Sequence, residues 1–382
     1  MSDGARIYFD HASSEAITDK VADKIRRLLD GGLFFDPGRN YAEALLPRQE
    51  IEEARRLVAD FFGAKPHEVI FTSSGTEAVN LAAGGAKLGA GPPLSAFADT
   101  EHQAVKKSAR QNGKTVKINT DRLGRLDLEH LEYLLKKDAQ EKPSLVHCQM
   151  ANHEVGTLQP YSLVSELCAK YGVSLHLDAC TAAGHLRLDF ASLGADYLSV
   201  SGHKLGAPPG VGALILKRTK RIGALIYGGS QERGKRAGFE NILGIAGLGA
   251  ACAELAEPGF LEQKECRIKA LHDYTLTLLR QIKTAEIYGD PVNKLFYILC
   301  FGVRNLSGEA VLRELDRGGV AVHSGSACAA ETIEPSEVLE SMGIPGDTSL
   351  RISFGAENTK EEADRFAVLL RQALDKYSGY FS

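Results

Sequence analysis

Short apolar runs alternate with helical patterns along most of this chain. The runs are rich in β-branched residues, which favours strands, and five of them stand out: residues 69–72, 145–149, 173–178, 197–202 and 211–217. Apolar residues at helical spacing predict helices at 50–62, 77–88, 162–171 and 360–377. Most of the last four strands lie about 15 to 30 residues apart, which suits crossover connections. The pattern predicts an α/β fold with a mostly parallel sheet flanked by helices.

The chain is long enough for more than one domain. Its 382 residues exceed the roughly 150 of an average domain, and a Glu-Pro-Gly segment at 257–259 interrupts a helical stretch. Beyond that segment, helices are mixed with alternating strands at 295–303, 319–324 and 349–354. We therefore expect a large domain over residues 16–255 and a smaller α+β domain over residues 256–382.

Charge and cysteine content narrow the class of protein. The 45 basic and 49 acidic residues give a net charge of −4, which does not favour direct binding to nucleic acid. The seven cysteines are widely spread without a Cys-x-x-Cys pair, which fits a reducing compartment and predicts no metal site. The N-terminus has no signal-like apolar stretch, and no apolar run reaches the length of about 18 residues, so we expect a cytoplasmic protein without a membrane span.

Two chemically active side chains follow predicted strands. Lys204, in Ser201-Gly-His-Lys204, comes after the strand at 197–202, and Asp178 ends the strand at 173–178. A lysine in that place is either an ordinary surface residue or an amine at the carboxyl edge of the sheet, where α/β folds bind their ligands. A carboxylate at the same edge needs a positive partner to offset its desolvation, and a protonated pyridine nitrogen is such a partner.

A third signal lies upstream, where Thr72-Ser-Ser-Gly-Thr-Glu77 joins a strand to a helix. Free N–H groups and the positive end of the helix dipole bind anions such as phosphate at such a place. Taken alone, the segment is more commonly a simple helix cap. An anion cradle, an edge aspartate and an edge lysine together suggest pyridoxal phosphate held as a Schiff base.

Seven segments of the chain recur in a fixed order in one known family. They are Phe71-Thr-Ser-Ser-Gly-Thr-Glu77, Glu101-His102, Asn152-His-Glu-Val-Gly156 with Gln159-Pro160, His176-Leu-Asp-Ala179, Ser201-Gly-His-Lys204, Glu232-Arg-Gly-Lys-Arg-Ala-Gly238 and Ser324-Gly-Ser-Ala-Cys328. From residue 8 to about residue 366 the chain resembles the cysteine desulfurases, within the class V aminotransferase group of pyridoxal-phosphate enzymes. The resemblance implies the fold-type I architecture, a homodimer, and residues 1–15 packed with the small domain.

The resemblance also implies roles for single residues. Lys204 forms the Schiff base, Asp178 pairs with the pyridinium nitrogen, and His102 stacks on the ring. Other positions implied to contact the cofactor are Gly75, Thr76, His153, Thr181, Ser201 and His203. Arg351 is implied to bind the substrate carboxylate, with Asp36 as a second substrate contact.

Cys328 is the residue on which the implied function depends. It lies in a stretch of small residues ahead of an amphipathic helix that opens at 334–336, and we interpret it as an exposed thiol on a mobile loop. The other six cysteines are expected to be buried small hydrophobes. By resemblance, L-cysteine becomes L-alanine while Cys328 takes the sulfur as a persulfide, with Lys204 and His102 moving protons. The sulfur then passes to an acceptor protein for iron–sulfur clusters, tRNA thiolation or DNA sulfur modification, and the residues do not say which.

Several positions depart from the family pattern. His153 replaces a usual asparagine, Thr181 a glutamine, Phe239 a threonine, Asp36 an asparagine and Ala356 an arginine. Cys180 adds a second thiol near the cofactor. These departures leave two alternatives open: a selenocysteine lyase, which shares the fold and cofactor, and a weakly active scaffold or partner subunit. A nicotinamide dehydrogenase is disfavoured, because no Gly-x-Gly-x-x-Gly follows a strand.

Overall fold

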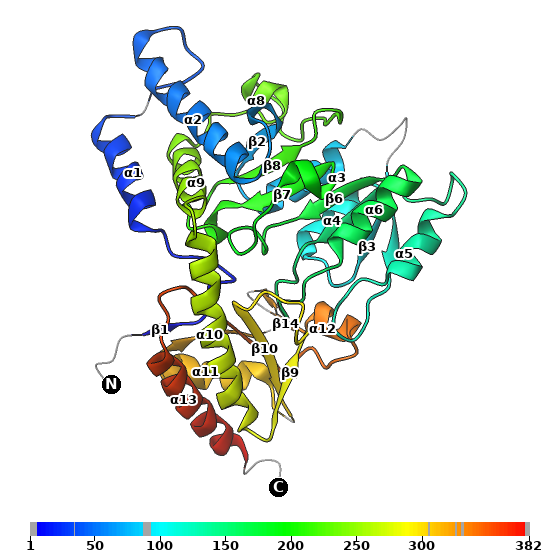
Figure 1. The fold of residues 1–382 in the computed structure, drawn as a ribbon, viewed down its shortest axis with the longest axis vertical. Helices are drawn as coiled ribbons and strands as arrows, with labels where there is room; N and C mark the ends of the chain where they lie inside the picture. The colour runs from blue at the N-terminus through cyan, green and yellow to red at the C-terminus, as the bar shows by residue number, and fades with distance from the viewer. Residues whose placement is uncertain are drawn as a thin grey trace.

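The central feature of the computed structural model is a seven-stranded sheet (Figure 1). In order across the sheet, its strands are β2 (Val69–Thr72), β8 (Gly212–Leu216), β7 (Tyr197–Ser201), β6 (Ser174–Asp178), β5 (Leu145–Gln149), β3 (Leu94–Ala98) and β4 (Lys114–Ile118). The structure describes residues 6–33, 35–86, 93–304, 306–324, 327–329 and 332–378, with the backbone alone for 327–329, 332–334 and 378.

The strands from β3 to β7 run parallel, which confirms the predicted α/β class. β8 is the exception, because it runs antiparallel to both β7 and β2. The connection at 202–211 is too short for a crossover helix, which needs a dozen or more residues, so the chain reverses direction instead. Lys204 lies in this reversal, immediately beyond the carboxyl end of β7.

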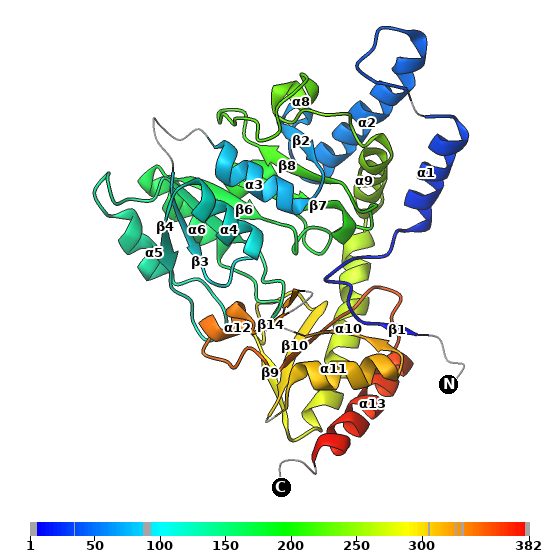
Figure 2. The same ribbon diagram turned by 180° about the vertical axis from the view of Figure 1, so that it is seen from behind.

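Helices cover both faces of the sheet. α6 (Tyr161–Tyr171) lies in front of it in Figure 1, whereas α3 (Gly75–Gly85) and α4 (Gln103–Asn112) lie in front in the reverse view of Figure 2. The other helices of this part are α1 (Asp19–Asp30), α2 (Leu45–Phe61), α5 (Leu128–Leu135), α7 (Phe190–Leu193), α8 (Gln231–Gly234) and α9 (Ile242–Leu255). The helices predicted at 50–62, 77–88 and 162–171 are present as α2, α3 and α6, and residues 87 and 88 lie outside the described part.

α9 packs closely against α2, and its sequence explains why. The helix is rich in alanine and glycine, and nearly all of it is buried. A Cβ on Gly249 would lie 2.7 Å from Cα of Ala54 on α2, so only glycine permits this approach. Closely packed helices here leave little room for side-chain adjustment.

The C-terminal part contains a four-stranded antiparallel sheet. Across it, the order is β12 (His323–Ser324), β15 (Ser349–Ser353), β10 (Ile298–Val303) and β9 (Ala285–Tyr288). Its helices are α10 (Phe260–Arg280), α11 (Gly308–Arg317), α12 (Glu337–Ser341) and α13 (Lys360–Ser378). Between β12 and α12, the backbone forms a short hairpin of β13 (Ala327–Ala329) and β14 (Thr332–Glu334).

The N-terminal segment joins this smaller part. β1 (Ile7–Tyr8) pairs in parallel with β11 (Val320–Ala321), and Asp10 forms a bridge with Ser353, so the blue N-terminal segment lies within the C-terminal part (Figure 1). α9 ends and α10 begins on either side of residues 256–259, near the proposed boundary at 255. The buried apolar cluster nevertheless extends through both sheets, and the division into domains stays a prediction.

Among the described residues, no single helix is both long and apolar enough to cross a membrane. Only α9 and α10 pass that test jointly, and the two are bent by 80° at the break between them.

Candidate active site

A cavity of about 570 Å³ opens at the carboxyl ends of β5, β6 and β7. All the residues that the sequence predicted as cofactor contacts line it: Gly75, Thr76, His102, His153, Asp178, Thr181, Ser201, His203 and Lys204. The wall is completed by Val79, Ala104, Gln149, Ala151 and Cys180. The fold therefore brings residues from three strand ends and from the N-termini of α3 and α4 to one place.

Asp178 is the buried carboxylate of the cavity. Its Oδ1 accepts hydrogen bonds from the Cys180 backbone N–H at 2.9 Å and from the Ser199 hydroxyl at 3.0 Å. Burial alone would raise the pKa of Asp178, but His176 and the hydrogen bonds from Cys180 outweigh burial, and the pKa is lowered. Asp178 is therefore an anion at neutral pH, which suits the protonated pyridine nitrogen that was expected from the sequence as its positive partner.

Lys204 supplies the amine of the cavity. Burial lowers the pKa of its ammonium group, Arg351 acts in the same direction, and Cys180 and Asp178 oppose them. A lowered pKa increases the fraction of neutral amine, which is the nucleophilic form. Within the described part of the chain, Lys204 forms no salt bridge that would hold its Nζ away from the cavity.

The N-terminus of α3 forms the other end of the cavity. The Ser74 hydroxyl caps the helix by accepting the Glu77 N–H at 3.2 Å, and Gly75 opens the first turn. A Cβ at Gly75 would lie 2.4 Å from the Cys180 sulfur and 3.0 Å from Cβ of Ser201, so this turn leaves room only for glycine. The helix dipole and this open turn suit a phosphate group. An anion cradle, a buried carboxylate and an amine together match the three polar ends of pyridoxal phosphate, so the residues present fit that cofactor.

Two imidazoles, His102 and His153, face each other at the mouth of the cavity. Their ring centroids lie 5.0 Å apart in an edge-to-face arrangement. His102 Nδ1 accepts the Ala104 backbone N–H at 3.1 Å, so the ring's own proton is on Nε2. Burial lowers the pKa of both rings, with Lys204 nearby acting in the same direction. Both imidazoles are therefore neutral at physiological pH.

A second hollow of about 710 Å³ adjoins the cavity, and His102 and His153 line both. Arg351, on β15, lies in this hollow. Its terminal nitrogens donate to the His153 carbonyl at 2.7 Å, to the Asp10 carboxylate at 2.6 Å and to the Ser13 hydroxyl at 2.8 Å. Its Nε is buried without a partner. The guanidinium is thus fixed beside the cofactor cavity with its Nε donor unused.

Asp36 lies elsewhere in the single chain. Its carboxylate accepts the Gly38 N–H at 2.8 Å and pairs with Arg39 at 2.9 Å in an exposed turn. It lines neither the cavity nor the adjoining hollow. The implied role of Asp36 as a substrate contact stays a prediction.

The segment that carries Cys328 begins and ends at the second hollow. His323 before it and Pro335 after it both line the hollow, and the backbone between them includes the hairpin in which Cys328 pairs with Ile333. The side chain of Cys328 lies outside the described residues.

Two contacts attach α12 to the larger part beside this hollow. The Ser336 hydroxyl donates to Glu154 at 2.5 Å, and Lys106 pairs with Glu337 at 2.5 Å. Burial raises the pKa of Glu154 to about 7. The C-terminal end of the Cys328 segment is thereby held next to the cavity.

The predicted burial of the other cysteines is correct for Cys148, Cys168, Cys252 and Cys300. Cys180 is half-buried in the cavity wall, where burial and the neighbouring Asp178 raise the pKa of its thiol. The prediction is wrong for Cys266, because this residue is exposed on α10. It lies on the solvent face of that helix between Glu265 and Arg267, so it buries no apolar surface.

Sequence reasoning missed two buried polar residues of the site. Gln149 ends β5, its Nε2 donates to the Thr100 carbonyl at 2.8 Å, and its backbone N–H donates to Glu101 at 2.7 Å. Burial, with Asp178 contributing, raises the pKa of Glu101 to about 8. The signal that could have found Gln149 is the one that found Asp178, a polar residue ending an apolar strand.

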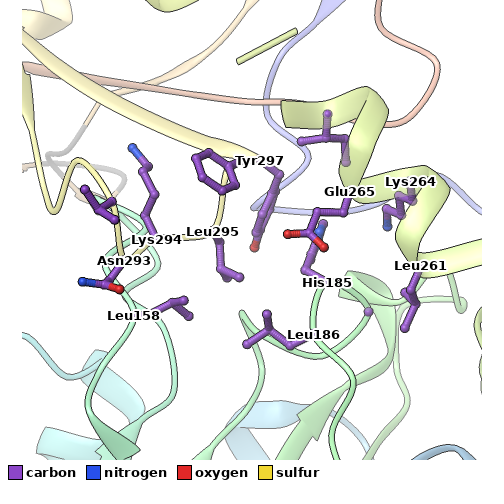
Figure 3. Close-up of a pocket in the computed structure, with 14 residues that line it drawn as sticks. Leu158, His185, Leu186, Leu261, Lys264, Glu265, Asn293, Lys294, Leu295 and Tyr297 are labelled. Carbon is purple, nitrogen blue, oxygen red and sulfur yellow. The ribbon is translucent and has the colours of Figure 1, made fainter. Parts of the chain in front are cut away.

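A third hollow of about 670 Å³ is lined by residues that include His185, Lys264 and Tyr297 (Figure 3). Tyr297 and His185, labelled in that view, stack with their ring centroids 3.6 Å apart. The Tyr297 hydroxyl donates to the Thr181 carbonyl at 3.0 Å, so this stack supports the back of the cofactor cavity. This support could not be predicted from the sequence, because Tyr297 directly precedes β10 of the smaller sheet and lies 116 positions from Thr181.

Comparison with known proteins agrees with the site. The aminotransferase class-V family model matches residues 7–366. The cysteine desulfurase IscS of Dictyoglomus turgidum is 33% identical over 97% of this chain and 95% of its own length. An IscS-like cysteine desulfurase of Mycobacterium tuberculosis is 36% identical over 95% of this chain and 94% of its own. The crystal structure of a NifS-like protein from Rickettsia africae is 29% identical and superimposes with a TM-score of 0.87, over 97% of this chain and 99% of that one.

Proposed function

Since the chain belongs to the aminotransferase class-V family and, within it, to the cysteine desulfurases, we propose that it converts L-cysteine to L-alanine and passes the sulfur through Cys328 to an acceptor protein. The observation that carries the proposal is the cavity, because it joins an anion cradle, Asp178 and Lys204 next to a hollow that holds Arg351 and both ends of the Cys328 segment. Family membership makes the enzyme dependent on pyridoxal phosphate.

Different residues of the cavity would hold different parts of the cofactor. Gly75 and Thr76 at the start of α3, with Ser201 and His203, would bind its phosphate. Asp178 would face the ring nitrogen, and Lys204 would bond to the cofactor. When bound, pyridoxal phosphate supplies an electron sink that weakens the Cα–H bond of an attached amino acid.

The chain's own groups then move protons and orient the substrate. Lys204 has a lowered pKa and is suited to take the Cα proton. His102 carries its proton on Nε2 and is suited to donate it or take it back. Arg351 Nε is the unused donor for the substrate carboxylate, while Asp10 and Ser13 keep the guanidinium in place.

Cys328 completes the reaction as a thiolate nucleophile. Its sulfur attacks the sulfur of the substrate, the Cβ–S bond of the substrate breaks, and a proton replaces sulfur on Cβ. L-cysteine and the thiol of Cys328 thereby become L-alanine and a persulfide on Cys328, with all atoms accounted for. Attack of an acceptor thiol on the persulfide then regenerates the enzyme.

We also propose a homodimer. Leu225, Ile226, Tyr227 and Phe239 are all exposed in one stretch of chain, and Tyr227 is 85% exposed. An exposed apolar group of this kind commonly marks a contact between proteins. Light scattering of the purified enzyme tests this, and a monomer at micromolar concentration would contradict it.

The decisive experiment is intact mass spectrometry of the reductant-free holoenzyme after incubation with L-cysteine, together with an assay for alanine. We expect the wild type to gain one sulfur and form alanine, and Cys328→Ser to gain none. Cys266→Ser is the matched control, because Cys266 is an exposed thiol on α10, and this variant should gain sulfur like the wild type.

Other outcomes would support a different function for the protein. A cofactor-loaded protein that forms no alanine would be a scaffold or partner subunit. A kcat/KM that is far higher for L-selenocysteine than for L-cysteine would identify a selenocysteine lyase. Persulfide transfer to candidate acceptor proteins, followed by mass, would then separate the iron–sulfur, tRNA and DNA pathways.

A further inference from the structure

Beneath the cofactor cavity, four buried polar side chains form a continuous hydrogen-bonded row across three strands. His147 on β5 stands in register with His176 on β6, and Asp178 on β6 stands in register with Ser199 on β7. The contacts are His147 Nδ1 to His176 Nδ1 at 2.8 Å, His176 Nε2 to the Ser199 hydroxyl at 3.1 Å, and that hydroxyl to Asp178 Oδ1 at 3.0 Å. The mechanism above uses only Asp178.

The position of each proton in this row follows from the anion at its end. An ionised carboxylate only accepts hydrogen bonds, so the single proton of the Ser199 hydroxyl points at Asp178. The Ser199 oxygen must then accept from His176, which places the proton of His176 on Nε2. Its Nδ1 is left as an acceptor, and His147 must therefore donate from Nδ1.

The opposite order of protons is disfavoured. If His176 donated from Nδ1, its Nε2 would accept from Ser199, and two oxygens without a proton between them would face each other at 3.0 Å. Burial keeps both rings neutral, since it lowers the pKa of His176 to about 4 and that of His147 well below its usual value. His147 Nε2 is buried without a partner, which is consistent with a lone pair rather than a charged N–H at the end of the row.

We propose that His147 is a positioning residue for the cofactor, which acts through His176 and Ser199 by aligning three donors toward Asp178. Each donor in the row polarises the next, and together they stabilise the ionised form of Asp178. An ionised Asp178 in turn favours a protonated ring nitrogen, on which the electron sink depends. This inference rests on the proposed function only for the identity of the group that Asp178 faces.

The first test determines which ring nitrogen of His147 and of His176 carries the proton. Holoenzyme labelled with ¹⁵N at its 11 histidines gives long-range ¹H–¹⁵N correlations that distinguish the two neutral forms of each ring. We expect the proton of His147 on Nδ1 and that of His176 on Nε2, with signals assigned by their loss in single variants. A proton on Nε2 of His147 or on Nδ1 of His176 would overturn the proposal. This readout needs no turnover, so it stands even where the desulfurase assignment fails.

The second test follows the bound cofactor by its visible absorbance as a function of pH. His147→Leu removes the terminal donor, so the ring nitrogen should hold its proton less firmly, and the midpoint of its deprotonation, followed by the absorbance, should shift to lower pH. His147→Asn keeps an N–H donor and should restore part of the shift. His272→Asn is the matched control, because His272 is a buried histidine with an unpartnered Nε2 on α10, far along the chain from the row. An unchanged midpoint in His147→Leu, or an equal shift in the control, would contradict the proposal.

Discussion

Replacing Glu101 with glutamine is expected to stabilise the protein at neutral pH and to do much less at acidic pH. Glu101 is buried, its Oε1 accepts the Gln149 N–H at 2.7 Å, and its Oε2 has no hydrogen-bond partner. Burial, with Asp178 adding repulsion, raises its pKa from 4.5 to about 8. The side chain is therefore a neutral acid in the folded protein at pH 7.

The magnitude follows from the difference between the folded and unfolded states. A raised pKa gives stability that is complete below pH 4.5 and is lost as pH rises to about 8, because only the unfolded chain releases the proton in that range. Each pH unit corresponds to about 1.4 kcal/mol, so the loss at pH 7 amounts to about 3 kcal/mol. Glutamine does not titrate, and Glu101→Gln avoids this loss.

The assay is urea unfolding followed by circular dichroism at pH 5 and pH 7, since the chain has no tryptophan for fluorescence. We expect the variant to gain about 3 kcal/mol over the wild type at pH 7 and under about 1 kcal/mol at pH 5. Comparing the two pH values cancels any fixed cost of burying the amide. Glu166→Gln, at an exposed position of α6, is the control and should stay within about 0.5 kcal/mol at both. An equal difference at the two pH values would refute the reasoning.

Three further results are expected. Gly75→Ala should abolish cofactor binding, measured by visible absorbance, because its Cβ would lie 2.4 Å from the Cys180 sulfur; adding Cys180→Ala should restore part of it, and no restoration would argue against crowding. Arg55→Met should cost about 3–5 kcal/mol in urea unfolding, because it leaves buried Glu232 without two hydrogen bonds of 2.9 and 2.7 Å. Adding Glu232→Gln should recover part of that loss, and an unchanged loss would show that lost packing dominates. Arg351→Lys should raise KM for L-cysteine roughly tenfold with a smaller effect on kcat, and an unchanged KM would remove Arg351 from substrate binding.

Much of the larger sheet could be predicted from the sequence. The runs at 69–72 and 145–149 coincide with β2 and β5, because every residue of both strands is buried and such strands read as mainly apolar runs. β3 and β4 escaped prediction, since Leu-Ser-Ala-Phe-Ala contains three small residues and no β-branched one, and Lys-Thr-Val-Lys-Ile is mostly exposed. The antiparallel direction of β8 was also not predicted, because it depends on the short connection at 202–211 rather than on the residues of the strand.

Site residues that lie within one short motif could be predicted from the sequence. Contacts between segments that are far apart in the sequence could not. The predicted cofactor contacts, from Gly75 to Lys204, lie beside strand or helix ends, and all but Thr181 belong to a short family motif. By contrast, the pairing of Arg351 with Asp10 joins residues 341 positions apart, and no local pattern encodes it. The row from His147 to Asp178 likewise depends on the register of neighbouring strands, which the sequence alone does not specify.

The contact between Arg351 and Asp10 also sets an order of assembly during protein synthesis. Every residue that lines the cofactor cavity lies between positions 75 and 204, and the sheet beneath them is complete once β8 has left the ribosome at residue 216. The N-terminal segment is made first, but its partner strands β11 and β15 are made near the end. A nascent chain could therefore build the proposed cofactor cavity while more than a hundred residues are still to come, whereas Arg351, which we propose to bind the substrate carboxylate, is positioned only when the chain is almost finished.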